Sequence, residues 1–345
     1  MKVISEKPAP KKSTRFSYLI GRIRVMEKGL VNSRVLESAL RSDDFEQARR
    51  VISELPGLGE MIQNIEKEPD AIDRSLVTNF WDTVKGIGSH KAGRNIARFF
   101  SLPFDFANAK LAVKRNYLSS QAQVREYPGE IPREKFSGFI GGESREFLPE
   151  AFRHGLEEAW MGYENTRDPQ HIELVLDRYA LEEALSLGRT YESAVLRNWV
   201  IAYVIFAFIR AALRARFQER SVETLGHLYF KNPYIRMADL EELISGSEEN
   251  VRESISKLGF ADLIPASEGF QNNPAHLAEL EKAMDDYLMR FIRRYRTSAF
   301  GPEPVFGFLY ARLTDTRNLR IILLGKYFGL AEEDLRAKTR ECYHE

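Results

Sequence analysis

Residue types that commonly do chemistry are present in this sequence, but they are scattered along it. There are six histidines and a single cysteine, Cys342. One cysteine can form neither an intramolecular disulfide nor a four-cysteine zinc site, and no histidine belongs to an H-E-x-x-H motif or a Cys–His cluster. The glycine-rich stretch 88–95 contains a lysine but lacks the spacing of a P-loop, and the G-x-S-x-G motif is absent. The sequence therefore predicts no catalytic residue, no cofactor and no metal.

The most distinctive polar residues are an Asp and an Asn three positions apart, which occur twice. Asp105 and Asn108 begin DFANAKLAVKRNY, and Asp315 and Asn318 occupy the same places in DTRNLRIILLGKY. Residues three apart share one face of a helix. For Asp105 two interpretations stay open, an N-cap after the helix entrance expected at 102–104, or a polar brace. No helix breaker precedes Asp315, so there the sequence favours a brace to an arginine of a neighbouring helix.

A second segment repeats at nearly the same distance. SDDFEQARRVISEL at 42–55 matches SGSEENVRESISKL at 245–258. In both cases the two copies are about twice a hundred residues apart. A third copy is therefore expected halfway between them, near residue 205. There, Ile205 and Phe208 take the places of the polar pair, which makes the middle copy degenerate. The repeats predict three helical modules of about 100 residues, each closed by a long helix.

Helical spacing of apolar residues dominates the chain, and we expect an all-α protein with roughly 65–75% helix. Asp168 and Pro169 mark a helix start, as an N-cap followed by a first-turn proline. Breaks are expected at 119–136 and 218–235, with a loop at 297–304. The predicted organisation is a flexible tail at 1–12, followed by modules at 13–125, 126–222 (the degenerate copy) and 223–345.

Charge and hydropathy narrow the classes of partner. The 50 basic and 50 acidic residues cancel, so the chain as a whole lacks the basic surplus of a nucleic-acid binder. The longest apolar run, Trp199 to Ile209, is too short for the roughly 20 residues of a membrane span. We expect it to form a buried helix. Charged residues interrupt the N-terminus, so no secretory signal is predicted. Any membrane contact would then be made through partner proteins.

Both ends of the sequence resemble one protein family. The N-terminal pattern is carried by Tyr18, Arg22, Arg24 and Glu27, and the C-terminal pattern by Asn318, Leu319, Arg320, Gly325 and Lys326. In these residues, in length and in its threefold repeat, the chain resembles the C subunit of archaeal and bacterial A/V-type ATP synthases, known in eukaryotic V-ATPases as the d subunit. The middle third matches loosely.

The resemblance implies a funnel-shaped, pseudo-threefold helical protein of the rotor, without an active site. It would sit on the cytoplasmic face of the membrane c-ring, receive the tip of the central stalk (the D and F subunits), and transmit torque for ATP-linked proton or sodium transport. Candidate partner contacts are Arg22, Arg24, Arg197, Arg210, Arg320 and Lys326, for each of which an intramolecular salt bridge is the alternative. Gly325 would allow close approach of another backbone, and Gly329 is a candidate helix cap.

Two other functions compete with the rotor adaptor. An unrelated helical scaffold that binds peptides would show repeats of about 30–45 residues, shorter than the period found here. A helical enzyme would need a deep pocket with convergent ionisable groups, for which the sequence gives no sign.

Overall fold

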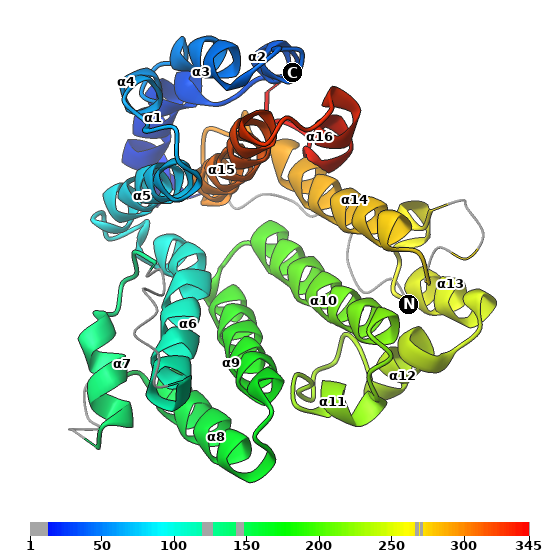
Figure 1. The fold of residues 1–345 in the computed structure, drawn as a ribbon. Coiled ribbons are helices and arrows are strands. Elements are labelled where there is room, and N and C mark those ends of the chain that lie inside the picture. The colour runs from blue at the N-terminus through cyan, green and yellow to red at the C-terminus, as the bar shows by residue number, and fades with distance from the viewer. Residues whose placement is uncertain (1–12, 119–126, 143–147, 266–268, 270–271, 345) are drawn as a thin grey trace. The chain divides into compact units, whose positions relative to one another are not determined.

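The computed structural model describes residues 13–118, 127–142, 148–265, 269 and 272–344, and its helices account for 74% of the chain (Figure 1). The predicted tail 1–12 lies outside the described residues. Within them there is no β-strand, only an isolated bridge between Asn32 and His344. The all-α prediction is confirmed.

The six long helices of the described residues come in three pairs that are consecutive in sequence. They are α5 (Pro69–Gly88) with α6 (Arg94–Leu118), α9 (Pro169–Thr190) with α10 (Ala194–Phe217), and α14 (Pro274–Arg293) with α15 (Glu303–Tyr327). Shorter helices precede each pair: α2 (Ser33–Leu40), α3 (Phe45–Ser53) and α4 (Gly59–Gln63); α7 (Arg133–Ile140) and α8 (Glu150–Thr166); α12 (Met237–Ser245) and α13 (Glu248–Lys257). The remaining helices are α1 (Ser17–Met26), α11 (Val222–Gly226) and α16 (Glu332–Lys338), with 3₁₀ turns at Thr14–Phe16, Glu27–Gly29 and Ala261–Leu263. This order agrees with three modules, whose boundaries stay a prediction.

The helices form two compact units. The described parts of one fall within Arg98–Tyr191 and Val200–Leu277, and those of the other within Glu6–Ala97, Glu192–Trp199 and Ala278–Glu345. We call them the middle unit and the terminal unit. Two of the expected breaks are largely non-helical, although α11 interrupts 218–235 and α15 begins at Glu303. The break at 119–136 is described only from Tyr127, and α7 already begins at Arg133 within it.

In the terminal unit, α15 is the central element. Helices α1, α2, α3, α5 and α16 all contact it, and Figure 1 shows α16 lying beside it at the C-terminal end of the chain. From Glu303 to Arg312 every residue of the helix is buried, so this half has no solvent-facing side and its polar residues need partners inside the protein. Farther along, Arg317 and Arg320 are exposed, whereas Asp315 and Asn318 lie on the buried side.

In the middle unit, aromatic side chains link the helices. Phe106 of α6 stacks on Phe152 of α8 with ring centroids 4.2 Å apart, and Phe206 of α10 meets Phe260 edge-on at 4.6 Å. The apolar run in α10 is buried as expected, apart from the half-buried Tyr203 and Ala207. Along this closing helix, aromatic packing accompanies polar contacts such as the hydrogen bond that Arg216 donates to the carbonyl of Gly246 at 2.8 Å.

The interpretation of Asp105 as an N-cap is wrong. Helix α6 runs through Pro103, which lies inside it, and Asp105 is in its interior. A proline inside a helix removes one backbone donor and crowds the carbonyl one turn earlier, at a cost of about 3 kcal/mol or more. The flanking residues Phe100, Leu102 and Phe106 are all buried, so packing on both sides of the proline keeps the helix continuous.

The predicted start of α9 is confirmed and gives a simple stability test. The Asp168 carboxylate accepts a hydrogen bond from the backbone N–H of Gln170 at 2.9 Å, and Pro169 occupies the first turn. We expect Asp168→Ala to lower the free energy of unfolding by about 1 kcal/mol, because the first-turn donor loses its acceptor. Urea denaturation followed by circular dichroism measures this. Asp168→Asn, which retains an acceptor, should lose much less, and equal losses for both variants would contradict a capping role.

Candidate functional site

The two asparagines of the repeat hold backbone in the same way. Asn108 accepts the N–H of Tyr127 at 3.0 Å and donates to the carbonyl of that residue at 2.8 Å. Asn318 accepts the N–H of Arg340 at 2.8 Å and donates to its carbonyl at 2.9 Å. A carboxamide presents one donor and one acceptor side by side, as a peptide unit requires. Each asparagine thus fixes one residue of a non-helical segment that follows its closing helix.

The two aspartates receive a backbone N–H as well. Asp105 accepts from Ile131 at 3.0 Å, and Asp315 accepts from Val31 at 3.1 Å. Burial raises the pKa of Asp105 to about 6, although the Ile131 N–H and the nearby Arg98 oppose this. Burial raises the pKa of Asp315 to about 7, opposed by Arg312 and by the Val31 N–H. Both carboxyl groups are therefore poised to change protonation near neutral pH.

Asp315 does brace a neighbouring segment, but the prediction that its partner is an arginine of a neighbouring helix is wrong. Arg312 lies one turn before Asp315 in the same helix, α15, and the contact to another segment is the backbone N–H of Val31. Asp105 is similar, with Arg98 of its own helix at 3.2 Å. In each copy the cation comes from within the helix and the tertiary contact from a main-chain donor.

In the degenerate middle copy, a loop residue takes over the backbone contact that the polar pair makes in the other copies. Ile205 and Phe208 are fully buried, and Phe208 packs on the ring of Phe230, with centroids 5.5 Å apart. The N–H of Ile235 is instead accepted by Asn232 at 3.1 Å. An amide within the loop thus supplies the acceptor that an aspartate supplies in the other copies.

The second repeated segment also has matching contacts. Arg49 of α3 donates to the carbonyl of Gln63 at 3.1 Å, and Arg252 of α13 donates to that of Pro265 at 2.9 Å. Each arginine also forms an ion pair one turn earlier on its own helix. The two matched arginines therefore tie a short helix to the segment that follows it in both copies.

The N-terminal pattern lies on α1 and the turn after it. Tyr18 is 65% exposed and stacks on His90, and Arg22 donates to the carbonyl of Gly86 at 2.9 Å. Arg24 pairs with Glu27 at 2.9 Å and also reaches the carbonyl of Ser298 at 3.1 Å. These contacts tie α1 to other parts of the terminal unit. Arg24 is a candidate partner contact with an intramolecular ion pair as the alternative, and the structure contains that ion pair.

The C-terminal pattern has a largely structural explanation. Arg320 pairs with the buried Asp73 at 3.2 Å. Gly325 is close to a side chain rather than to another backbone, because a Cβ there would lie 2.1 Å from Leu335 of α16. Gly329, at a φ of 70°, follows the end of α15 as expected of a cap. Lys326, like Arg197 of α10, is half-buried. Partner contact by any of these residues stays a prediction.

Arg210 lines a cavity of about 530 Å³ in the middle unit, between α6, α9, α10 and α11. Its charged lining residues are Lys110, Asp177, Arg210 and Arg214. Lys110 pairs with Asp177 at 2.7 Å and Glu173 at 2.8 Å. Burial lowers the pKa of Lys110, but the two carboxylates outweigh it and raise that pKa above its ordinary value. The cavity is thus concave, with an apolar part and a part lined by charged residues of both signs.

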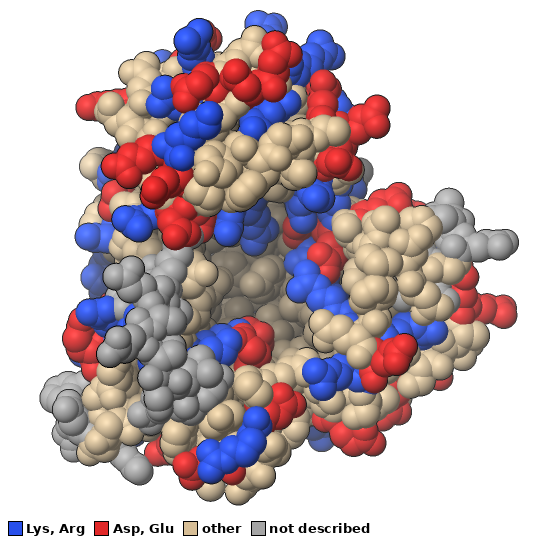
Figure 2. Space-filling view, in the orientation of Figure 1, with Lys and Arg blue, Asp and Glu red and all other residues tan. Residues whose placement is uncertain are grey.

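Sequence reasoning missed the exposed apolar residues. Val25 of α1 is 68% exposed, Met161 of α8 64%, and Phe328, directly after α15, 64%. Residue type alone cannot separate these from core residues. Position in the chain gives one signal of exposure, because Phe328 and Leu330 flank the capping Gly329 beyond the end of α15. On the face drawn in Figure 2, acidic and basic side chains are interleaved.

Two kinds of feature are absent from the described residues. No group of three or more His, Cys, Asp or Glu side chains there is placed to hold a metal ion. None of the helices described has the length and apolar character of a membrane span.

Comparison with known proteins identifies the family. The family described as ATP synthase (C/AC39) subunit matches residues 19–338. The chain is 23% identical to the C subunit of the V-type sodium ATPase of Enterococcus hirae, over 91% of this chain and 97% of that protein. It is 23% identical to the C subunit of the A-type ATP synthase of Methanocaldococcus jannaschii, over 93% and 85%, and to that of Halorubrum lacusprofundi, over 94% and 97%. The chain therefore belongs to the ATP synthase (C/AC39) subunit family and is a non-catalytic subunit of an A/V-type ATPase.

Proposed function

We propose that this chain is the rotor adaptor of its ATPase. It binds the membrane c-ring on one side and the D and F subunits of the central stalk on the other, at the cytoplasmic face of the membrane. Its task is to transmit torque between ATP turnover and proton or sodium transport.

The observation that carries this proposal is the family match over nearly the whole chain, from residue 19 to residue 338. Physical features of the protein support it. Packed helices are stiff, as a torque-bearing part must be. The charged and apolar cavity lined by Arg210 and the exposed Phe328 provide surfaces of different chemistry, as two partners would require.

Cross-linking in the assembled ATPase tests the rotor assignment. Single cysteines are introduced at exposed positions such as Tyr18, Met161 and Phe328 and scanned for links to c-ring, stalk and stator proteins. The native Cys342 is first replaced by serine, so that each introduced cysteine is the only thiol of the chain. A link to the c-ring or stalk joins parts that turn together, so ATP-driven ion transport should continue. A link to the stator should stop it.

Deletion of the chain is the complementary test. The soluble motor should still hydrolyse ATP, while ATP-driven ion transport should be lost and the c-ring should no longer co-purify with the D and F subunits. A deletion strain that still assembles a fully coupled ATPase would refute the proposal. So would transport that stops when the chain is linked to the c-ring.

A further inference from the structure

The Asp–Asn pair holds the start of the next group of short helices. In the first copy, Asn108 fixes Tyr127, and Asp105 receives the N–H of Ile131, two residues before α7 begins at Arg133. The pair thus joins α6 to the helices that follow it in sequence. In the middle copy Ile235 also lies two residues before a helix, α12, and is held by Asn232.

In the last copy the pair holds the start of the first group of short helices of the chain. Asp315 receives the N–H of Val31, again two residues before a helix, here α2 at Ser33. Arg340 and Val31 are far apart in sequence, whereas Tyr127 and Ile131 are four residues apart. His344, four residues beyond Arg340, lies beside the start of α2 through its bridge to Asn32. In the first copy, one continuous segment supplies both residues that the Asp–Asn pair holds. In the last copy, the C-terminal segment supplies one of them and the N-terminal segment supplies the other.

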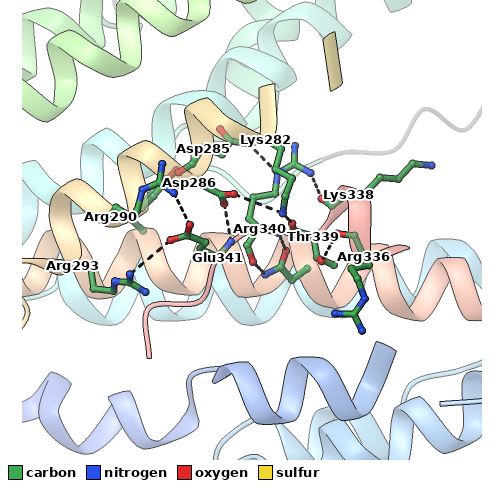
Figure 3. Close-up of polar contacts among 12 residues, drawn as sticks. Lys282, Asp285, Asp286, Arg290, Arg293, Arg336, Lys338, Thr339, Arg340 and Glu341 are labelled. Atoms are coloured by element: carbon green, nitrogen blue, oxygen red, sulfur yellow. Dashed lines mark hydrogen bonds and ion pairs between the residues drawn. The ribbon is translucent and has the colours of Figure 1, made fainter. Parts of the chain in front are cut away.

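Residues 339–344, which we call the strap, are held mainly through their main chain. The N–H of Glu341 donates to Asp286 at 2.7 Å, and the carbonyl of Thr339 accepts from Lys282 (Figure 3). The carbonyls of Cys342 and Tyr343 accept from Arg293 at 3.1 Å and from Arg296 at 3.2 Å.

Side-chain ion pairs add to this hold. Glu341 pairs with Arg290 at 2.6 Å, and Arg340 pairs with Asp285 at 3.1 Å (Figure 3). Cys342 and Tyr343 point inward and are 4% and 1% exposed. A cavity of about 430 Å³ borders the strap, between it and residues of α2, α14 and α16. One side of the strap is therefore held by polar contacts instead of close packing, which favours local opening over global unfolding.

We propose that the strap and the Asp315–Asn318 pair form a latch that closes the C-terminal helices onto the N-terminal ones, and that the strap can open locally while the rest of the protein stays folded. The latch is a property of the free chain and does not depend on the rotor role.

Cys342 is the only cysteine of the chain, so its reaction with a thiol reagent reports strap opening directly. In Asn318→Ala the two hydrogen bonds to Arg340 are lost, and we expect Cys342 to react about 10- to 30-fold faster. The matched control is Asn108→Ala, which removes the same two bonds in the middle unit and should change the rate less than about twofold. In hydrogen exchange by mass spectrometry, Asn318→Ala should expose segments 29–33 and 339–344 together. Asn108→Ala should expose 127–131 instead.

Glu341→Gln is the second variant, in case Asn318→Ala does not fold. It changes only partly exposed ion pairs and should raise the reaction rate severalfold. The latch is refuted if the two asparagine variants speed the reaction equally, which would indicate global unfolding, or if neither Asn318→Ala nor Glu341→Gln speeds it. It is also refuted if segment 339–344 exchanges faster without segment 29–33.

Discussion

Asparagine in place of Asp315 should stabilise the terminal unit, and should do so much more at pH 8 than at pH 5. Burial raises the pKa of Asp315 to about 7 from its ordinary 3.8. A raised carboxyl pKa means that the folded state holds the proton more tightly than the unfolded state does. Its contribution to stability is then complete below about pH 4 and is lost as the pH rises through 7.

The size of the effect follows from the same two values. Between pH 5 and pH 8 they correspond to a loss of about 2–3 kcal/mol in the wild type. Asparagine resembles the protonated aspartic acid in shape and charge, and its oxygen can still accept the N–H of Val31. The variant should therefore match the wild type below about pH 4, and its advantage over the wild type should grow by about 2–3 kcal/mol between pH 5 and pH 8.

Urea denaturation at both pH values measures this difference. In a Trp160→Phe background, the remaining Trp81 and Trp199 both lie in the terminal unit and report its unfolding. Asp105→Asn is the matched control, since Asp105 lies in the middle unit and has a raised pKa of about 6. It should leave the pH dependence of the terminal unit largely intact. Equal pH slopes for the wild type and Asp315→Asn would show that Asp315 does not titrate in this range.

What could be predicted from the sequence was local chemistry and repetition. The cap at Asp168 and the glycine after α15 depend on neighbouring residues only, so residue type and order were sufficient. The all-α class followed from helical periodicity over long segments. The repeats pointed to the Asp–Asn pairs, and the structure gives both copies the same backbone contacts.

What could not be predicted depends on contacts distant in sequence. The partner of Asp315 is Val31, 284 residues away, and a backbone N–H leaves no trace in residue type. Pro103 suggested a helix start at Asp105, but buried neighbours on both sides kept α6 continuous, so packing overrode local propensity. Asn232 performs the role of the missing aspartate from a loop, where its residue type is typical of an ordinary turn.

Removing the cation beside Asp315 should have the largest effect on stability. Arg312 is 9% exposed and donates to the carbonyl of Gly29 at 3.3 Å and to the amide oxygen of Asn79. Arg312→Leu leaves both acceptors without this donor and takes the cation away from the Asp315 carboxylate. At pH 8 this leaves the Asp315 carboxylate as an uncompensated buried charge, which costs about 3–5 kcal/mol. Asp315→Asn creates no such charge on residue 315, and Arg312 keeps its bonds to Gly29 and Asn79 there.

The pH dependence of this loss separates charge from packing. At pH 5, Asp315 holds a proton in the folded state and needs no cation, so Arg312→Leu should lose roughly half as much as at pH 8. Adding Asp315→Asn to Arg312→Leu should recover more stability at pH 8 than at pH 5. The same tryptophan signal, read over the full double-mutant cycle at both pH values, measures the coupling between the two side chains. A coupling that is equal at pH 5 and pH 8 would mean that Arg312 acts through its packing and its bonds to Gly29 and Asn79, and not through the charge of Asp315.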